Sequence, residues 1–204
     1  MEKILYRGAE SIVYLKDSTV IKDRIKKNYR INEIDDKLRS QRNRKESKLI
    51  EKAVGIAPKL INVDDRNKII EMEYIEGEVL RDVLDKLDDK EKKKILNEVG
   101  KNIALLHGKD IIHGDLTTTN MIVKNEQVFF VDFGLGFISK RIEDKAVDLH
   151  LMREALESKH YKHAEECFDL ILEGYKNYSL YREVVERYKK VEQRGRYKRK
   201  QQLA

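Results

Sequence analysis

Cysteine, proline and tryptophan are scarce in this sequence of 204 residues, which contains one Cys, one Pro and no Trp. The single thiol, Cys167, excludes an internal disulfide and a metal site built from several cysteines. The single proline, Pro58, leaves no proline-rich segment, and no Gly/Ser-rich linker or repeat occurs before residue 187. The length therefore fits one large domain or two small lobes that share a core.

Long apolar runs are missing as well. The apolar run at residues 128–131 is short and charged residues interrupt the others, so no segment is expected to span a bilayer. The first ten residues carry a charge at every second or third position and do not resemble a signal peptide. We therefore predict a soluble, cytoplasmic protein with no membrane partner.

Lysine and arginine are concentrated at the C-terminal end. Residues 187–204 contain eight Lys and Arg and one acidic residue, so this segment carries +7, one more than the whole chain's net +6. Unpaired cations attract phosphate backbones or acidic partners, which favours a binding segment over a solvated helix end. Residues 22–48 contain eleven basic and five acidic residues, and this interleaving is typical of a solvated helix.

The first third of the chain predicts a sheet and one long helix. Helical spacing of apolar residues extends from Tyr29 to Ala53, and Pro58 ends this helix by forcing Ala57 into an extended conformation. Short runs rich in β-branched or aromatic residues, bounded by turn-forming residues, predict strands at 4–6, 12–15, 20–22, 60–64 and 68–74.

The rest of the chain is predominantly helical. Helical patterns cover 79–106 and 146–190, and residues 121–131 are expected to form a hairpin that turns at Asn125-Glu126. The fold class is α+β, with two lobes. The expected parts are an N-lobe at 1–75 with sheet and helix, a reduced helical C-lobe at 76–190, and a basic tail at 191–204.

The strongest functional motif is His113-Gly114-Asp115-Leu116-Thr117-Thr118-Thr119-Asn120, followed twelve residues later by Asp132-Phe133-Gly134. These residues resemble the catalytic loop and D-F-G motif of the protein-kinase superfamily. Phosphoryl transfer requires that phosphates, metal ions and acceptor be held in line. Asp115 is predicted to orient the attacking hydroxyl or water, whereas Asn120 and Asp132 offer the hard oxygen ligands that Mg²⁺ prefers.

Most other kinase elements occur in the expected order. Val20-Ile21-Lys22 resembles the strand that carries the lysine for the ATP phosphates. Glu46 precedes Leu49, Ile50 and Ala53 at core-facing helical spacing, so it is the candidate partner of this lysine. By the same resemblance, Met72 occupies the gatekeeper position, and the Glu73 carbonyl and Ile75 amide would contact the adenine.

Three departures distinguish the chain from ordinary protein kinases. The glycine-rich loop retains only Gly8, with Ser11 and nearby amides left to contact phosphates. Gly114 replaces the usual arginine before the catalytic aspartate. Asp148 lies only fourteen positions after Gly134, without an A-P-E motif between them, so the segment that docks peptide substrates is missing.

This combination is similar to the PRPK-type kinase/ATPase subunit of the KEOPS complex. The resemblance runs nearly from end to end. Its motifs are Arg7-Gly8-Ala9-Glu10, Ile21-Lys22-Asp23-Arg24, Arg42-x-x-x-Glu46, Glu73-Tyr74-Ile75-x-Gly77, the HGDLTTTN and VDFGLG segments, Glu143-Asp144-Lys145-Ala146-Val147-Asp148-Leu149 and the basic C-terminus.

The resemblance implies an atypical serine/threonine kinase or ATPase that uses ATP and Mg²⁺ in support of threonylcarbamoyladenosine modification of tRNA. Its implied partners are a carbamoyltransferase subunit, to which some members are fused, and a small regulatory subunit. The tail would then contact tRNA through Arg194, Arg196, Lys198, Arg199 and Lys200.

Three alternatives remain. A RIO-like atypical serine kinase is also short, but such proteins usually lack the glycine of D-F-G, which is present here. An aminoglycoside-type phosphotransferase shares H-G-D but needs a larger helical insertion for its acceptor. A non-catalytic RNA-binding or scaffolding module would not need Lys22, Asp115, Asn120 and Asp132 together.

Overall fold

The chain divides into two compact units in a computed structural model that describes the backbone of residues 2–202 and the side chains of residues 2–193. The first unit contains the residues up to Glu76 together with Phe129–Gly136, and the second contains Gly77–Val128 and the residues from Phe137 onward. The D-F-G segment thus belongs to the same unit as the N-terminal sheet. The lobe and tail boundaries expected from the sequence stay a prediction.

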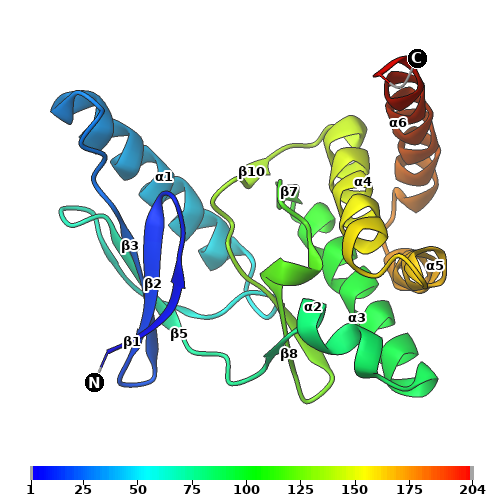
Figure 1. The fold of residues 1–204 in the computed structure, drawn as a ribbon, viewed down its shortest axis with the longest axis horizontal. Coiled ribbons are helices and arrows are strands. Elements are labelled where there is room, and N and C mark those ends of the chain that lie inside the picture. The colour runs from blue at the N-terminus through cyan, green and yellow to red at the C-terminus, as the bar shows by residue number, and fades with distance from the viewer. Residues whose placement is uncertain (1, 203–204) are drawn as a thin grey trace. The chain divides into compact units, whose positions relative to one another are not determined.

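The first unit contains a five-stranded antiparallel sheet (Figure 1), and its strand order is β1-β2-β3-β5-β4. The residues between β2 and β3, Asp17 and Ser18, both have positive φ, as a tight hairpin turn requires. The strands are β1 (Lys3–Arg7), β2 (Ser11–Lys16), β3 (Thr19–Arg24), β4 (Leu60–Asp64) and β5 (Ile69–Glu73).

The long helix α1 (Asn32–Lys52) packs against this sheet (Figure 1) through contacts with β4 and β5. Its last turns bury Leu49 and Ile50, whereas its earlier turns bury polar side chains. The helix begins three residues later than the sequence predicts, and the amide of Arg30 instead bonds the carbonyl of Lys27 in a preceding turn. Gly55, with φ of 84°, reverses the chain after the helix.

The second unit is mainly helical, which confirms the α+β fold class. Its strand β8 pairs with β6, and Asn125 and Glu126 form the predicted hairpin turn with positive φ. The elements after Glu76 are β6 (Glu78–Val79), α2 (Leu80–Val83), the 3₁₀ helix η1 (Leu84–Lys86), α3 (Asp89–Gly108), β7 (Ile111–Ile112), the 3₁₀ helix η2 (Thr118–Asn120), β8 (Met121–Lys124), β9 (Gln127–Phe130), β10 (Phe137–Ile138), α4 (Ile142–Lys159), α5 (Ala164–Tyr175) and α6 (Tyr181–Gln202); the last two residues of β9 belong to the first unit.

The continuous helix predicted over 79–106 is wrong, because the chain leaves helical geometry between η1 and α3. Asp88 caps α3 by accepting a hydrogen bond from the amide of Glu91, whose side chain bonds back to the Asp88 amide. This capping box was present in the sequence, but the apolar pattern that continues on both sides of it concealed the break. The helix predicted from residue 146 begins at Ile142, and the two-residue strands β6, β7 and β10 were not predicted.

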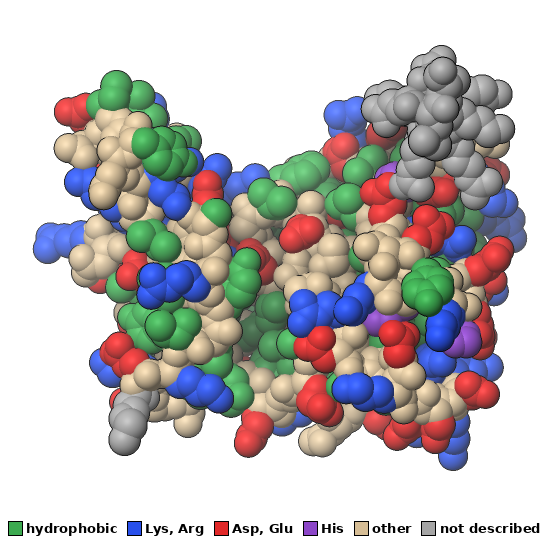
Figure 2. Space-filling model, viewed as in Figure 1, with side chains coloured by type: hydrophobic (Ala, Val, Ile, Leu, Met, Phe, Trp, Pro, Cys, Tyr) green, Lys and Arg blue, Asp and Glu red, His purple; other side chains and the backbone are tan. Residues whose placement is uncertain are grey.

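The surface carries both charge signs in alternation. Figure 2 shows Lys and Arg interspersed with Asp and Glu on the visible face. Among exposed apolar residues, Ile4 and Tyr6 lie on the edge strand β1. Among the described residues, no helix is both long and apolar enough to cross a membrane.

Two glycines permit the close approach of α3 and α5 in the second unit. A Cβ atom on Gly100 would lie 2.0 Å from the carbonyl oxygen of Ile171, and one on Gly174 would lie 2.0 Å from that of Asn97. Both obstacles are backbone atoms, which cannot rotate away. The two helices therefore pack backbone to backbone at this crossing.

Replacing either Gly100 or Gly174 by Ala should force these helices apart. We expect overpacking to lower the melting temperature of each variant by about 5 °C or more. Gly108→Ala is the matched control, because nothing lies within 4 Å of its added Cβ and it occupies the last residue of α3. Thermal unfolding followed by circular dichroism measures the effect; equal stability of all three variants would contradict the close packing.

Candidate active site

Lys22 is the centre of a buried ionic cluster in the first unit. Alternation along β3 points Lys22 and Arg24 to the same face of the sheet, and both are buried. The Lys22 Nζ atom lies 2.6 Å from Oε1 of Glu46 on α1 and 2.8 Å from Oδ1 of Asp132. The structure thus contains the Lys22–Glu46 ion pair that the sequence suggested and adds Asp132 to it.

The carboxylates around Lys22 keep it charged. Burial alone would lower the pKa of Lys22, but the negative charges of Glu46 and Asp132 outweigh burial and raise the pKa above its ordinary value. Lys22 is therefore a cation at neutral pH. Glu46 is only 1% exposed, so its charge requires such a partner.

The Asp132-Phe133-Gly134 segment has a specific backbone conformation. Asp132 has φ of 62°, a left-handed geometry that Asp tolerates better than most residues. Its Oδ1 accepts a hydrogen bond of 3.2 Å from the amide of Gly134, and Phe133 is fully buried beside it. A Cβ on Gly134 would lie 3.0 Å from the same Oδ1 atom, so glycine leaves room for the carboxylate. The half-exposed Asp132 side chain is thereby fixed by backbone and Lys22 together.

Asp115 and Asn120 are brought together in the second unit. The Asn120 Nδ2 group donates to Oδ2 of Asp115 at 2.8 Å and to its backbone carbonyl at 2.9 Å. The helix η2, which ends at Asn120, sets this distance. Since Nδ2 faces Asp115, the Asn120 atom left to face a cation is the oxygen.

Asp148 holds the backbone that carries Asp115. This α4 residue is 1% exposed, and its two oxygens accept hydrogen bonds from the amides of His113 at 2.7 Å and Gly114 at 2.8 Å. The His113 ring is itself buried, and its Nδ1 accepts from the Asp115 amide at 3.3 Å. These contacts are structural for His113, and no role was predicted for Asp148 from the sequence.

His107 on α3 supports the same carboxylate. Its Nε2 lies 3.5 Å from Oδ2 of Asp148, and its Nδ1 lies 2.7 Å from the hydroxyl of Tyr175. Burial raises the pKa of Tyr175 far above its usual value, so the hydroxyl keeps its proton beside the ring.

The remaining predicted residues of the first unit lie around the sheet. The Gly8 amide bonds the Ser11 carbonyl at 2.9 Å and closes the turn between β1 and β2, where Ser11 is buried. Glu73 is the last residue of β5, with its side chain 3.3 Å from the Lys59 amide. Ile75 follows outside the strand and is buried.

Sequence reasoning missed two residues of this region. Arg24 bonds the second oxygen of Glu46, so one buried carboxylate binds two cations of β3. Glu10, in the turn after Gly8, pairs with Arg42 on α1 and with Arg30. The alternation of Lys22 and Arg24 in a predicted strand was the available signal for Arg24.

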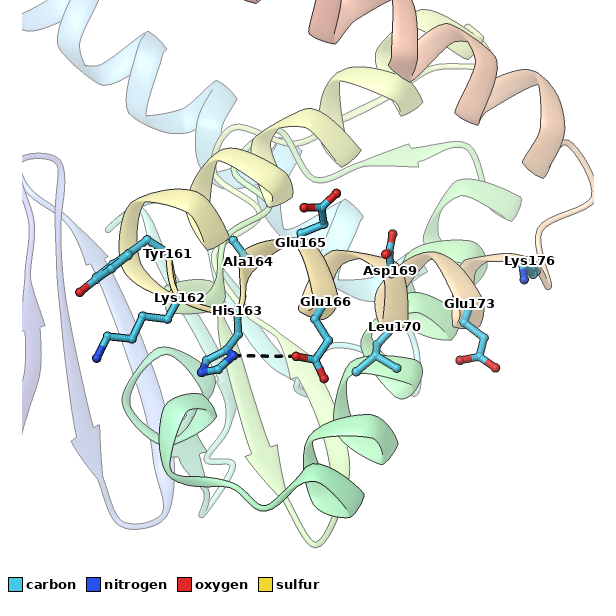
Figure 3. A pocket seen from close by; sticks show the side chains of 10 residues that line it. All are labelled: Tyr161, Lys162, His163, Ala164, Glu165, Glu166, Asp169, Leu170, Glu173 and Lys176. Carbon is cyan, nitrogen blue, oxygen red and sulfur yellow. Dashed lines mark ion pairs between the residues drawn. The ribbon is translucent and has the colours of Figure 1, made fainter.

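One open hollow in the second unit contains none of these motif residues. It is an open depression along α5 in the second unit (Figure 3), with side chains of both charges and an ion pair of 3.8 Å between His163 and Glu166. Within the part of the chain that the structure describes, no three His, Cys, Asp or Glu side chains converge to bind a metal. Cys167, on the same helix, is buried.

The predicted tRNA contacts at Arg194, Arg196, Lys198, Arg199 and Lys200 lie outside the residues whose side chains are described. The start of α6 lies beside α4 (Figure 1). Two ion pairs join these helices, His150–Glu192 at 2.5 Å and Arg187–Glu143 at 2.9 Å. Val184 and Tyr188 of α6 are buried, and the Tyr188 ring lies 5.2 Å from that of Phe168 on α5.

A sheet with a lysine–glutamate pair, a D-F-G segment and a loop carrying Asp115 and Asn120 together define a protein kinase domain. The sequence agrees, because residues 6–176 match the family described as Protein kinase domain. The KEOPS complex subunit Bud32 of Pyrococcus abyssi is 43% identical over 96% of both chains. The chain therefore belongs to the Bud32 family of protein kinase domains.

Two further relatives differ in length. The probable serine/threonine-protein kinase BUD32 homolog of Archaeoglobus fulgidus is 40% identical, with 95% of each chain covered. The probable bifunctional tRNA threonylcarbamoyladenosine biosynthesis protein of Methanothermobacter thermautotrophicus is 41% identical over 95% of this chain. This chain spans only 36% of that relative's length.

Asp148→Ala should release the loop that carries Asp115. Two buried amides would lose their acceptor, at a cost of about 1–3 kcal/mol each, so we expect lower stability and faster hydrogen exchange at His113 and Gly114. Asp144→Asn, on the same helix but bonded to Ser139, is the control. Unchanged exchange protection of these two amides in Asp148→Ala would refute the role of this carboxylate.

Proposed function

We propose that this chain performs Mg-ATP-dependent phosphoryl transfer, as an ATPase, a serine/threonine kinase or both, within a KEOPS-type complex that supports threonylcarbamoyladenosine modification of tRNA. The observation that supports it most is the buried Lys22–Glu46 pair with Asp132 beside it. A lysine held in place by one carboxylate, next to a second and more exposed one, suits the binding of phosphates and metal together.

Lys22 is proposed to bind the α- and β-phosphates of ATP. In the structure its ammonium group has two carboxylate partners, Glu46 and Asp132. Glu46 is buried and stays with the lysine, whereas the Asp132 side chain is 49% exposed and can exchange partners. Phosphate oxygens would take the place of Asp132 at Lys22, and Asp132 would turn to a cation.

The donor atoms fit Mg²⁺. Asp132 offers a carboxylate and Asn120 an amide oxygen, and both are hard ligands of the kind that this ion binds. A bound Mg²⁺ ion would neutralise charge on the phosphate oxygens during transfer. We assign Asp132 and Asn120 as its protein ligands.

Asp115 is proposed to orient the acceptor oxygen and to receive its proton. The Asn120 amide fixes one oxygen of this carboxylate, and Asp148 fixes the backbone that carries it. A base held from both sides needs little rearrangement when the acceptor arrives. The short connection between Gly134 and Asp148 lacks a peptide-docking segment, which favours water or an unusual hydroxyl as the acceptor.

Nucleotide recognition is proposed to use the end of the sheet. The Glu73 carbonyl and the Ile75 amide would bond the adenine edge, with Met72 behind it in β5. Gly8 and Ser11, at the turn between β1 and β2, would lie over the phosphates. This turn contains one glycine, so fewer backbone amides can approach the phosphates closely than in a full glycine-rich loop.

Partners follow from the relatives and from charge. The relatives include a KEOPS complex subunit and a tRNA threonylcarbamoyladenosine biosynthesis protein, which supports a carbamoyltransferase subunit and a small regulatory subunit as partners. We propose that the basic C-terminal residues contact tRNA phosphates without sequence preference. A cytoplasmic location is part of the same proposal.

Phosphoryl transfer is tested by two substitutions with different expected effects. Asp115→Asn should lower kcat by about 100-fold or more while ATP still binds, because only the base is lost. Asp132→Asn should weaken Mg-dependent nucleotide binding itself. Asp65→Asn, an exposed residue paired with Arg44, is the control. Phosphate release and label transfer to protein are measured with and without tRNA and the carbamoyltransferase subunit.

The two readouts distinguish the acceptors. Phosphate release without protein labelling identifies water, and labelling without release identifies a protein hydroxyl. If neither occurs with any combination of partners, the proposed activity is wrong and the chain is a scaffold.

The tail is tested by charge removal at constant length. Gln substitution of Arg194, Arg196, Lys198, Arg199 and Lys200 should weaken tRNA binding by about tenfold or more and reduce its salt dependence. The control replaces five exposed lysines outside the tail, namely Lys37, Lys48, Lys90, Lys93 and Lys101. Equal loss in both variants would show a general effect of net charge and exclude a tRNA-binding tail.

A further inference from the structure

One carboxylate in the first unit binds two cations. Oε1 of Glu46 accepts from Lys22 at 2.6 Å, and Oε2 accepts from Nη2 of Arg24. All three side chains are at least nine-tenths buried. Asp132 adds a second negative charge next to Lys22, so the cluster contains two cations and two carboxylates and is neutral as it stands.

The net charge of the cluster changes when Asp132 leaves Lys22 and binds the proposed Mg²⁺ ion instead. Without Arg24, the remaining pair of Lys22 and Glu46 would be neutral and would offer phosphate no net positive charge. With Arg24 bonded to Glu46, the three remaining groups carry a net charge of +1. This charge lies in a buried region, where solvent screens it weakly.

We propose that Arg24 is a positioning residue that compensates the charge of Glu46, so that Lys22 remains available as a cation for the phosphates of ATP. This inference rests on the proposed binding of ATP at Lys22. It assigns to Arg24 an effect on nucleotide affinity that is exerted through Glu46, without contact between Arg24 and the nucleotide.

The hydrogen bonding of Arg24 indicates that its charge, and not its packing, explains why an arginine occupies this position. Its Nε atom is buried and has no hydrogen-bond partner among the described residues. An unsatisfied buried N–H group destabilises the fold, so an apolar side chain of similar length would suit a purely structural position better. The guanidinium is explained if its charge is required beside Glu46.

The direct test compares nucleotides with and without phosphate. Binding of ATP with Mg²⁺ and of adenosine is measured by calorimetry for the wild type, Arg24→Met and Arg24→Lys. Arg24→Met should weaken ATP binding by about tenfold or more but adenosine binding by less than about twofold, because only phosphate senses the lost charge. Arg24→Lys, which restores a cation, should bind ATP within about threefold of the wild type.

A double variant tests the compensation itself. Glu46→Gln removes the charge that Arg24 balances, so Arg24→Met with Glu46→Gln should bind ATP several-fold more tightly than Arg24→Met alone. If Arg24→Met does not fold, the double variant is compared with the wild type, because both leave a net charge of +1 at this cluster once Asp132 has left; an ATP affinity about tenfold or more below the wild type would then overturn the inference. Absence of rescue, or parallel loss of ATP and adenosine affinity, would make Arg24 a structural residue and overturn the inference.

The wild-type measurement separates the two proposals. If the wild-type protein binds no ATP, the proposed function fails and this inference fails with it. If the wild type binds ATP and folded Arg24→Met binds it equally well, the function stands and the role of Arg24 alone is refuted.

Discussion

The buried carboxylate of Glu46 is the group on which the arrangement of the first unit depends. An isolated charge at 1% exposure would be very unfavourable, so this carboxylate must keep its partners on β3. Because Glu46 belongs to α1, its ion pairs with Lys22 and Arg24 on β3 fix the helix to the sheet. Because Lys22 also bonds Asp132, it fixes the D-F-G segment as well. Three parts of the chain that are distant in sequence are thus positioned by one charge.

The second unit follows the same principle with backbone partners. Asp148 is buried and satisfied by the amides of His113 and Gly114, and Lys145 is buried with Asp110 and the hydroxyl of Tyr178. Buried ion pairs add little net stability compared with apolar packing, since desolvation offsets their attraction. Their contribution here is to determine position. The apolar core of α3 and α5 supplies stability, and the buried charges determine where the functional side chains point.

The sequence predicted those features that have a local signature. Glu46 was identified because Leu49, Ile50 and Ala53 follow it at helical spacing, and Asp115, Asn120 and Asp132 because their motif is compact. Arg24 and Asp148 stand in the family motifs, but their roles were missed because burial distinguishes them, and the sequence does not show which of 43 Lys and Arg and 37 Asp and Glu become buried. The break before α3 was missed because periodicity alone does not show where one helix ends and the next begins.

The discontinuity of the first unit affects how the chain folds. Its sheet and α1 are complete by Glu76, but Phe129–Gly136 joins them only after the second unit's first helices have been synthesised. Until that segment is synthesised, the first unit lacks the buried side chain of Phe133. Lys22 also lacks its partner Asp132, which lies 110 residues further along the chain. Closing so long a loop is slow, whereas the β2–β3 hairpin forms from local contacts. During translation the chain therefore passes through a state with exposed apolar surface, in which the lysine is in place before its last partner exists.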